Sequence, residues 1–136
     1  MSRPDITTVL EARLGEWAEG RGLQVAYDNI PFDPPGGIYL TSHDMPATPY
    51  AIDLSQRSKV FIGVYQVNVV IPAAQGRAAG KAIASQLEDL FANGTEMSGE
   101  EFSCYISTEP AQFAGIPSGT TYTIPISMNY RADVAQ

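Results

Sequence analysis

The sequence has few of the residues from which most chemical sites are built. Its 136 residues include one cysteine, Cys104, and one histidine, His43. A single cysteine excludes a disulfide within the chain and a zinc site made of several cysteines. We predict that Cys104 is a small buried side chain on a strand rather than a reactive thiol.

Positive charge is also scarce. Eight lysines and arginines stand against fifteen aspartates and glutamates, so the net charge is −7. This balance argues against electrostatic binding of DNA, RNA or an anionic lipid surface. The start of the chain, MSRPDITTVLEARL, has no apolar core of a signal peptide, and no run reaches about 18 apolar residues. We therefore expect synthesis in a reducing cytoplasm and no membrane span.

Common catalytic and phosphate-binding motifs are missing. The sequence contains no G-x-x-x-x-G-K-[ST], G-x-G-x-x-G, G-x-S-x-G or H-E-x-x-H. Glu100 and Glu101 are adjacent at a turn and strand start, where they would face opposite sides and form no acid/base pair. We expect no cofactor, no metal site and no enzyme activity.

One catalytic alternative stays open. His43 precedes Asp44, and Asp53 follows ten positions after His43. Together they would supply metal ligands, or a base with the group that orients it, to a small hydrolase or ligand-binding domain. In that case His43→Ala would abolish the activity, whereas an assembly protein would tolerate it.

What the sequence does contain is typical of one globular domain spanning residues 1–136. Hydrophobic residues make up 44% of the chain and charged residues 17%. Residues 59–72, KVFIGVYQVNVVIP, form the longest apolar strand pattern. Its odd-numbered positions are almost wholly apolar and predict a face covered by a helix. The other face is polar at Gln66 and Asn68, so we expect it to be only partly covered.

Two helices are predicted, over residues 5–20 and 77–93. In the first, Asp5 or Ser2 can cap the start, and Gly20 and Gly22 mark the end. Both helices carry apolar residues at helical spacing. We expect the buried faces to consist of Ile6, Val9, Leu10, Leu14, Trp17 and Ala18 in the first helix, and Ala79, Ile83, Leu87, Leu90 and Phe91 in the second.

The remaining chain is predicted to be strands joined by turns rich in proline and glycine. Ser98-Gly99 is expected to be a hairpin turn, and Pro125 indicates that its strand lies at an edge or carries a bulge. Strands are expected at 23–27, 38–41, 95–97, 101–108 and 121–131, with loops at 28–37 and 109–119.

Residues 42–58 show no sustained period, which predicts a long loop or irregular hairpin. The predicted fold class is α+β: an antiparallel or mixed sheet with two α-helices on one face and this long loop between the second and third strands.

Several blocks resemble tail terminator proteins of long-tailed, siphovirus-like bacteriophages and prophages. The first block is LEARLGEWAEGRGLQVAYDNIPFDPPGGIYL, the second is GVYQVNVVIPAAQGRAAGKAIASQLEDLF, and the last is TYTIPISMNYRADV. The resemblance covers nearly all of the chain except residues 42–58 and 109–118. It rests on the order of the blocks, since none of them is a catalytic motif.

The resemblance implies a structural protein of the virion tail or neck, made in the bacterial host cytoplasm. Such proteins form a ring, a hexamer in the family's pattern, on the end of the tail tube. The ring stops tube polymerisation and forms the surface for the head–tail connector protein. Its partners would be further copies of itself, the major tail tube protein and that connector, with DNA only passing through the lumen. A head–tail connector or neck protein is the alternative role.

The interface residues are a separate hypothesis. Because the 42–58 segment is long and lies beside the longest strand, we expect it to contact a neighbouring subunit or the tube. Deleting residues 46–55 should then abolish ring assembly and leave a folded monomer. The expected contacts are Tyr50, Asp53, Leu54, Arg57 and Lys59.

Overall fold

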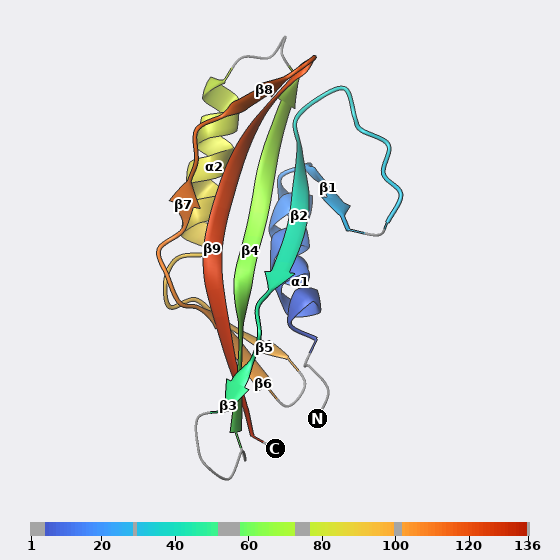
Figure 1. Ribbon diagram of the computed structural model, residues 1–136. Helices are drawn as coiled ribbons and strands as arrows, with labels where there is room; N and C mark the ends of the chain where they lie inside the picture. The colour runs from blue at the N-terminus through green and yellow to red at the C-terminus, as the bar shows by residue number, and fades with distance from the viewer. Residues whose placement is uncertain (1–4, 29, 52–57, 73–76, 100–101, 136) are drawn as a thin grey trace.

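The computed structural model describes residues 5–28, 30–51, 58–72, 77–99 and 102–135. Two helices and a mixed, curled sheet make an α+β fold (Figure 1), as predicted. In chain order the elements are α1 (Ile6–Gly20), β1 (Gln24–Tyr27), β2 (Tyr39–Pro46), β3 (Tyr50–Ala51), β4 (Ser58–Pro72), α2 (Ala78–Leu90), β5 (Glu96–Gly99), β6 (Phe102–Ile106), β7 (Ala111–Gln112), β8 (Ile116–Ser118) and β9 (Thr121–Ala135).

The sheet is built around β4 and β9. These two strands pair antiparallel along their whole length, from Ser58 opposite Ala135 to Pro72 opposite Thr121. The strand order is β1-β2-β4-β9-β6-β5, with β3 paired to β4 and with β7 and β8 paired to β9. Only β1 and β2 run parallel among the described pairs. The sheet therefore has two different edges. One consists of β1, and the other consists of β5 together with the short strands β7 and β8, which pair with a different part of β9 from β6.

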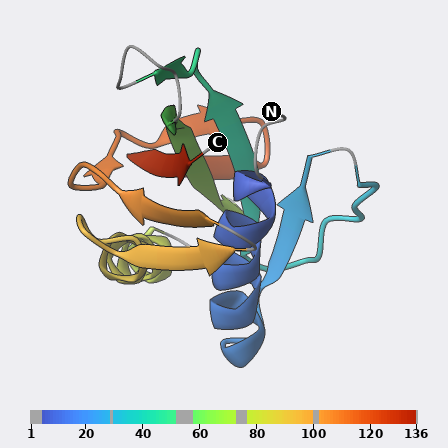
Figure 2. The same cartoon turned by 90° about the horizontal axis from the view of Figure 1, so that it is seen from below.

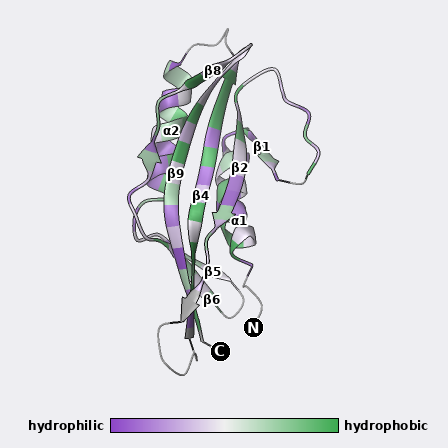
Figure 3. Ribbon diagram, viewed as in Figure 1, coloured by the Kyte–Doolittle hydropathy of each residue, from purple (hydrophilic) through white to green (hydrophobic). Residues whose placement is uncertain are grey.

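Both helices lie on the same face of the sheet, behind it in Figure 1 and separate from one another when seen from below (Figure 2). The odd-numbered residues of β4 point at them, and the predicted face is confirmed by the burial of Phe61, Tyr65, Val67, Val69 and Ile71. The alternation of apolar and polar residues along β4 and β9 is visible in Figure 3. It follows from the period of two, which sends neighbouring side chains to opposite faces.

Helix α1 begins and ends as its sequence predicts. The carboxylate of Asp5 accepts a hydrogen bond from the backbone N–H of Thr8, at 3.2 Å. This satisfies one of the helix's free N-terminal donors. At the other end Gly22 has a φ of +69°, and Leu23 N–H donates to Ala18 O. The buried residues of the helix are Ile6, Leu10, Leu14 and Ala18, with Val9 and Trp17 partly buried.

The predicted buried face of helix α2 is confirmed except at Ala79, which is exposed. Leu87 and Phe91 are fully buried, and Ile83 and Leu90 pack against the core. Gly80 and Ala84, which were not predicted, are buried as well. Gly80 is in close contact with the sheet, because a Cβ atom on it would lie 2.0 Å from Cδ1 of Ile71 on β4. The absence of a side chain at Gly80 therefore lets the helix backbone approach the sheet. Arg13 of α1 donates from Nε to Leu90 O, at 2.9 Å, and so supplies a partner for a carbonyl at the end of α2.

Two segments predicted as loops contain strands. In the 42–58 segment, Ser42–Pro46 continue β2 opposite Val67–Gly63, and Tyr50–Ala51 form β3 on β4. The long-loop alternative is wrong at these residues, whereas the irregular-hairpin alternative agrees with them. The 109–119 prediction is wrong where β7 and β8 pair with β9. These segments are too short to show the regular alternation from which a strand is predicted. They form strands because the neighbouring long strand supplies hydrogen-bonding partners to their backbone.

The hairpin turn and Pro125 also differ in part from expectation. Ser98 pairs with Ser103 and Gly99 with Phe102, so both lie within β5 and the turn was predicted too early. Pro125 is not on an edge strand, because β9 has partners on both sides. The strand β9 carries no bulge at Pro125 either, because its register with β4 is unbroken there, with Pro125 opposite Asn68. The extra residue lies in the partner segment, where four residue steps from Gln112 to Ile116 span only three from Ile126 to Thr123. Pro125 O accepts a hydrogen bond from Phe113 N–H. The backbone nitrogen of Pro125, which has no hydrogen to donate, faces the same irregular segment, where regular pairing is interrupted.

Candidate interaction surfaces

Of the residues predicted as an interface, Tyr50 and Lys59 lie at one end of the sheet. Tyr50 pairs through its backbone with Val60, and Ala51 pairs with Lys59, so β3 and the start of β4 form a short extension (Figure 1). Asp53, Leu54 and Arg57 lie outside the described residues. The contacts proposed for these residues and for Tyr50 and Lys59 remain a prediction.

The structure separates the residues of the catalytic alternative. His43 and Asp44 are neighbours on β2 and therefore face opposite sides of the sheet. His43 Nδ1 lies 3.1 Å from Asp28 Oδ1, and its Nε2 lies 3.1 Å from Thr41 Oγ1. Asp44 lies on the helix side, and Asp53 is outside the described residues. The described part of the chain holds no cluster of histidine, cysteine, aspartate and glutamate suited to a metal ion.

The face of the sheet turned away from the helices is uncovered in Figure 1, and we call it the open face. Gln66 Nε2 donates to Asn68 Oδ1 at 2.9 Å, and Arg131 Nε donates to Asp133 Oδ1 at 2.7 Å. Its side chains are mostly half-buried and mix polar with apolar character, which suits contact with water or with a polar protein surface. The open face comprises Thr41, His43, Ile62, Val64, Gln66, Asn68, Ser127, Asn129 and Arg131.

A polar network lies between α1 and the sheet. The hydroxyls of Ser42 and Tyr65 are 2.6 Å apart, and Ser42 Oγ donates to Glu11 Oε2 at 3.3 Å. Burial raises the pKa of the Glu11 carboxyl, an effect that the hydrogen bond from Ser42 opposes. Burial likewise raises the pKa of the Tyr65 phenol, so this group stays a neutral hydrogen-bonding partner. The network is therefore satisfied within the fold and offers no free reactive group.

A second polar contact joins α1 to both central strands. Asp44 accepts hydrogen bonds from the hydroxyls of Thr7 and Tyr130, the latter at 2.6 Å. The Tyr130 ring lies over Gly63, its partner on β4, where a Cβ atom would come within 2.4 Å of the phenol oxygen. The glycine thus makes room for the tyrosine that holds Asp44 in place.

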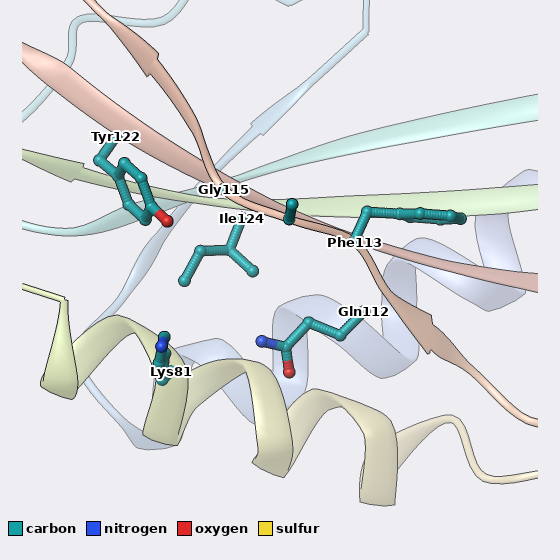
Figure 4. A pocket seen from close by; sticks show the side chains of 7 residues that line it. Lys81, Gln112, Phe113, Gly115, Tyr122 and Ile124 are labelled. Carbon is teal, nitrogen blue, oxygen red and sulfur yellow. The ribbon is translucent and has the colours of Figure 1, made fainter.

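A shallow pocket of about 340 Å³ opens between α2 and the β7–β8 edge, and we call it the flank pocket. Figure 4 shows Lys81 on α2, with Tyr122 and Ile124 of β9 across from it and Gln112 beside it. Gly115 gives space to Tyr122, because a Cβ there would lie 1.9 Å from the ring. The pocket is lined by Lys81, Gln112, Phe113, Ala114, Gly115, Tyr122 and Ile124.

A second hollow and two strongly exposed apolar side chains lie at the same end of the sheet. The hollow, of about 220 Å³, lies beside Arg77, whose guanidinium is 4.7 Å from the centre of the Tyr122 ring. Phe113 and Ile116, on the segment that forms β7 and β8, are 53% and 56% exposed. The sequence did not single out this surface, because residues around Lys81 and Phe113 are distant in the chain. The only local signal in the sequence was the presence of apolar residues such as Phe113 and Ile116 in the 109–119 segment, which its prolines and glycines predict to be a loop.

The comparisons with known proteins identify one family and two solved structures of similar fold. A family model described as phage tail terminator protein matches residues 5–130. A solved structure that carries no functional description is 32% identical, with a TM-score of 0.83, covering 97% of this chain and 96% of that one. A chain from the virion of a native gene transfer agent particle is 19% identical, with a TM-score of 0.63 and coverage of 96% and 95%, and shares the fold. No curated protein sequence matches this chain.

Proposed function

Because this chain belongs to the phage tail terminator family, we propose that it forms a ring of six subunits on the end of the tail tube. There it stops tube polymerisation and provides the surface to which the head attaches. The chain is a structural component of a phage tail, and the match over residues 5–130 is the observation that carries the proposal. Residues 1–136 act as one tail-terminator-like domain in this proposal.

The two different edges of the sheet support a ring. A cyclic assembly with heterologous contacts needs two unlike surfaces on each subunit, so that one side of a copy meets the other side of the next. Here β1 and its following loop form one side, and α2 with β7 and β8 forms the other (Figures 1 and 2). Repeating the same contact around an axis then closes the ring.

The charge of the chain supports a lumen that DNA passes through without binding. The net charge of −7 repels phosphate groups. In the same proposal, Tyr50, Asp53, Leu54, Arg57 and Lys59 contact a neighbouring subunit or the major tail tube protein. The protein is located in the virion tail, and we propose that it is made in the host cytoplasm and joins the tube there. Neither helix of the described chain is long and apolar enough to cross a membrane.

Electron micrographs of tails assembled with and without the protein test the proposal. We expect tubes of uncontrolled length in its absence and tubes of uniform length, closed by a ring, when it is restored. Tails of normal length that fail to join heads would contradict termination and support the head–tail connector role instead.

A further inference from the structure

Large apolar side chains that are strongly exposed lie on opposite sides of the described chain. Phe113 and Ile116 lie at the β7–β8 edge, beside the flank pocket. Ile30, which is 60% exposed, lies in the loop after β1, at the other edge of the sheet. Figures 1 and 2 both show this loop and α2 on opposite sides of the molecule. An exposed apolar residue on each of two opposite sides is what a head-to-tail contact between copies requires.

The 30–33 loop is held in a fixed shape by contacts within its own subunit. Ile30 N–H donates to Tyr27 O at 3.3 Å, and the Phe32 ring lies 5.2 Å from the Tyr39 ring, measured between centroids. Pro31 also restricts the backbone. Ile30 and Asp33 are both exposed. A preorganised loop loses little conformational freedom when it binds.

The charges on the two sides are complementary. The flank pocket presents Lys81, and Arg77 lies at the adjoining hollow, in a chain with only eight basic residues. The loop side presents Asp33, with Asp28 at its start. Since the rest of the chain is strongly acidic, a basic pocket lined by apolar groups fits an acidic segment with an apolar tip.

We propose that the 30–33 loop of one copy docks into the flank pocket of the next copy around the ring. Ile30 then packs against Phe113, and Asp33 pairs with Lys81. This inference rests on the proposed ring and identifies the contact that closes it. It also explains why Phe113 and Ile116 remain exposed in a single subunit.

Site-directed cross-linking on assembled tails tests the contact. The double variant Ile30→Cys/Phe113→Cys is added to tail tubes and treated with a short bis-maleimide. A matched control, Met45→Cys/Phe113→Cys, moves the first cysteine to another exposed apolar residue, which is 45% exposed and lies on β2. The native Cys104 is fully buried, so the wild-type protein serves as the unreactive background. Cysteines at exposed positions should leave the fold intact.

We expect most Ile30→Cys/Phe113→Cys subunits to run as covalent oligomers up to the size of the complete ring, and the control pair to stay monomeric. Rings that are visible on the tails but do not cross-link through this pair would overturn the inference and leave the ring intact. Cross-links from Phe113→Cys to a different tail protein would also overturn it. Absence of any ring on wild-type tails would instead refute the proposed function, and the inference with it.

A charge exchange gives a second measurement. Lys81→Glu should lower the amount of protein retained on tails several-fold, because it opposes Asp33 with a like charge. Asp33→Lys/Lys81→Glu should restore retention, since each subunit then carries the exchanged pair. Failure of the second change to rescue the first would contradict pairing between these two residues.

Discussion

The two helices cover the same face of the sheet, yet different interactions hold them there. Helix α2 lies close to β4 because Gly80 has no side chain, and its buried face consists of Gly80, Ala84 and Leu87. Helix α1 buries apolar residues too, but it also contributes Thr7 and Glu11 to hydrogen bonds with Asp44 and Ser42 of β2. Shape complementarity therefore positions α2, whereas α1 also depends on polar partners.

Tyr65 connects the two regions. Its hydroxyl lies 2.6 Å from Ser42 Oγ in the polar network under α1, and its ring packs edge-on against Phe91, with centroids 5.5 Å apart. Phe91 directly follows α2. Substitutions that change side-chain volume should therefore destabilise the protein most at α2. Substitutions that remove hydrogen bonds, and changes of pH, should act mainly through α1.

The largest effect is expected for Leu87→Ala on α2. Leu87 is fully buried, and its truncation leaves a cavity that a closely packed helix cannot collapse to fill. The free energy of unfolding should fall by about 2–5 kcal/mol. Urea unfolding followed by Trp17 fluorescence measures it, with the exposed Ser85→Ala as control. A loss as small as that of the control would contradict close packing of α2.

Tyr130→Phe should have the next largest effect, on the α1 side. The change removes the hydroxyl that donates to Asp44 and leaves the carboxylate with fewer partners. Hydrogen bonds to charged groups contribute about 1.5–3 kcal/mol, so a loss within that range is expected. Tyr105→Phe, on β6 opposite Arg131, is the matched control in the same unfolding assay. Equal losses for the two variants would contradict a stabilising hydrogen bond between Tyr130 and Asp44.

Gly80→Ala should destabilise the protein less strongly. Overpacking against Ile71 costs about 1–3 kcal/mol, and the better helix propensity of alanine offsets up to about 1 kcal/mol of this. Gly20→Ala at the end of α1 has open space around the new Cβ and should be neutral or stabilising. Thermal unfolding of both variants decides the point. A stabilised Gly80→Ala protein would mean that α2 is not held by close approach.

The smallest effect is expected for Glu11→Gln and depends on pH. Burial raises the pKa of Glu11 in the folded protein, so the unfolded chain loses its proton first as the pH rises. Stability contributed by this group therefore falls as the pH rises from the ordinary glutamate pKa through the raised value. The variant should equal the wild type in acid and exceed it near neutral pH, by less than about 1 kcal/mol because the group is partly solvated. Unfolding curves over that pH range measure it, and a difference that does not change with pH would contradict the assignment.

The candidate surfaces were only partly predictable from the sequence. The sequence predicted that the segment containing Tyr50 lies beside the longest strand. In the structure, β3 pairs with the start of that strand, at Lys59 and Val60 of β4. The alternative in which His43 and Asp44 form one site is wrong, because adjacent residues of a strand face opposite sides of the sheet. The sequence did not show this, because residues 42–46 were not predicted to be a strand. The flank pocket was missed because it combines α2 with a segment read as a loop. Contacts between distant segments leave no local pattern to detect.

The sequence by itself determined the elements whose own periodicity is long and regular. These are α1 with its Asp5 cap, the strands β4 and β9 with their buried faces, and the α+β class that follows from their order. The tertiary structure alone decided the close approach of α2 at Gly80, the strands β7 and β8, and the separation of His43 from Asp44. The physical reason is that periodicity encodes which side of an element is apolar, whereas close approach at Gly80 and pairing along β9 depend on neighbours that only the folded chain supplies.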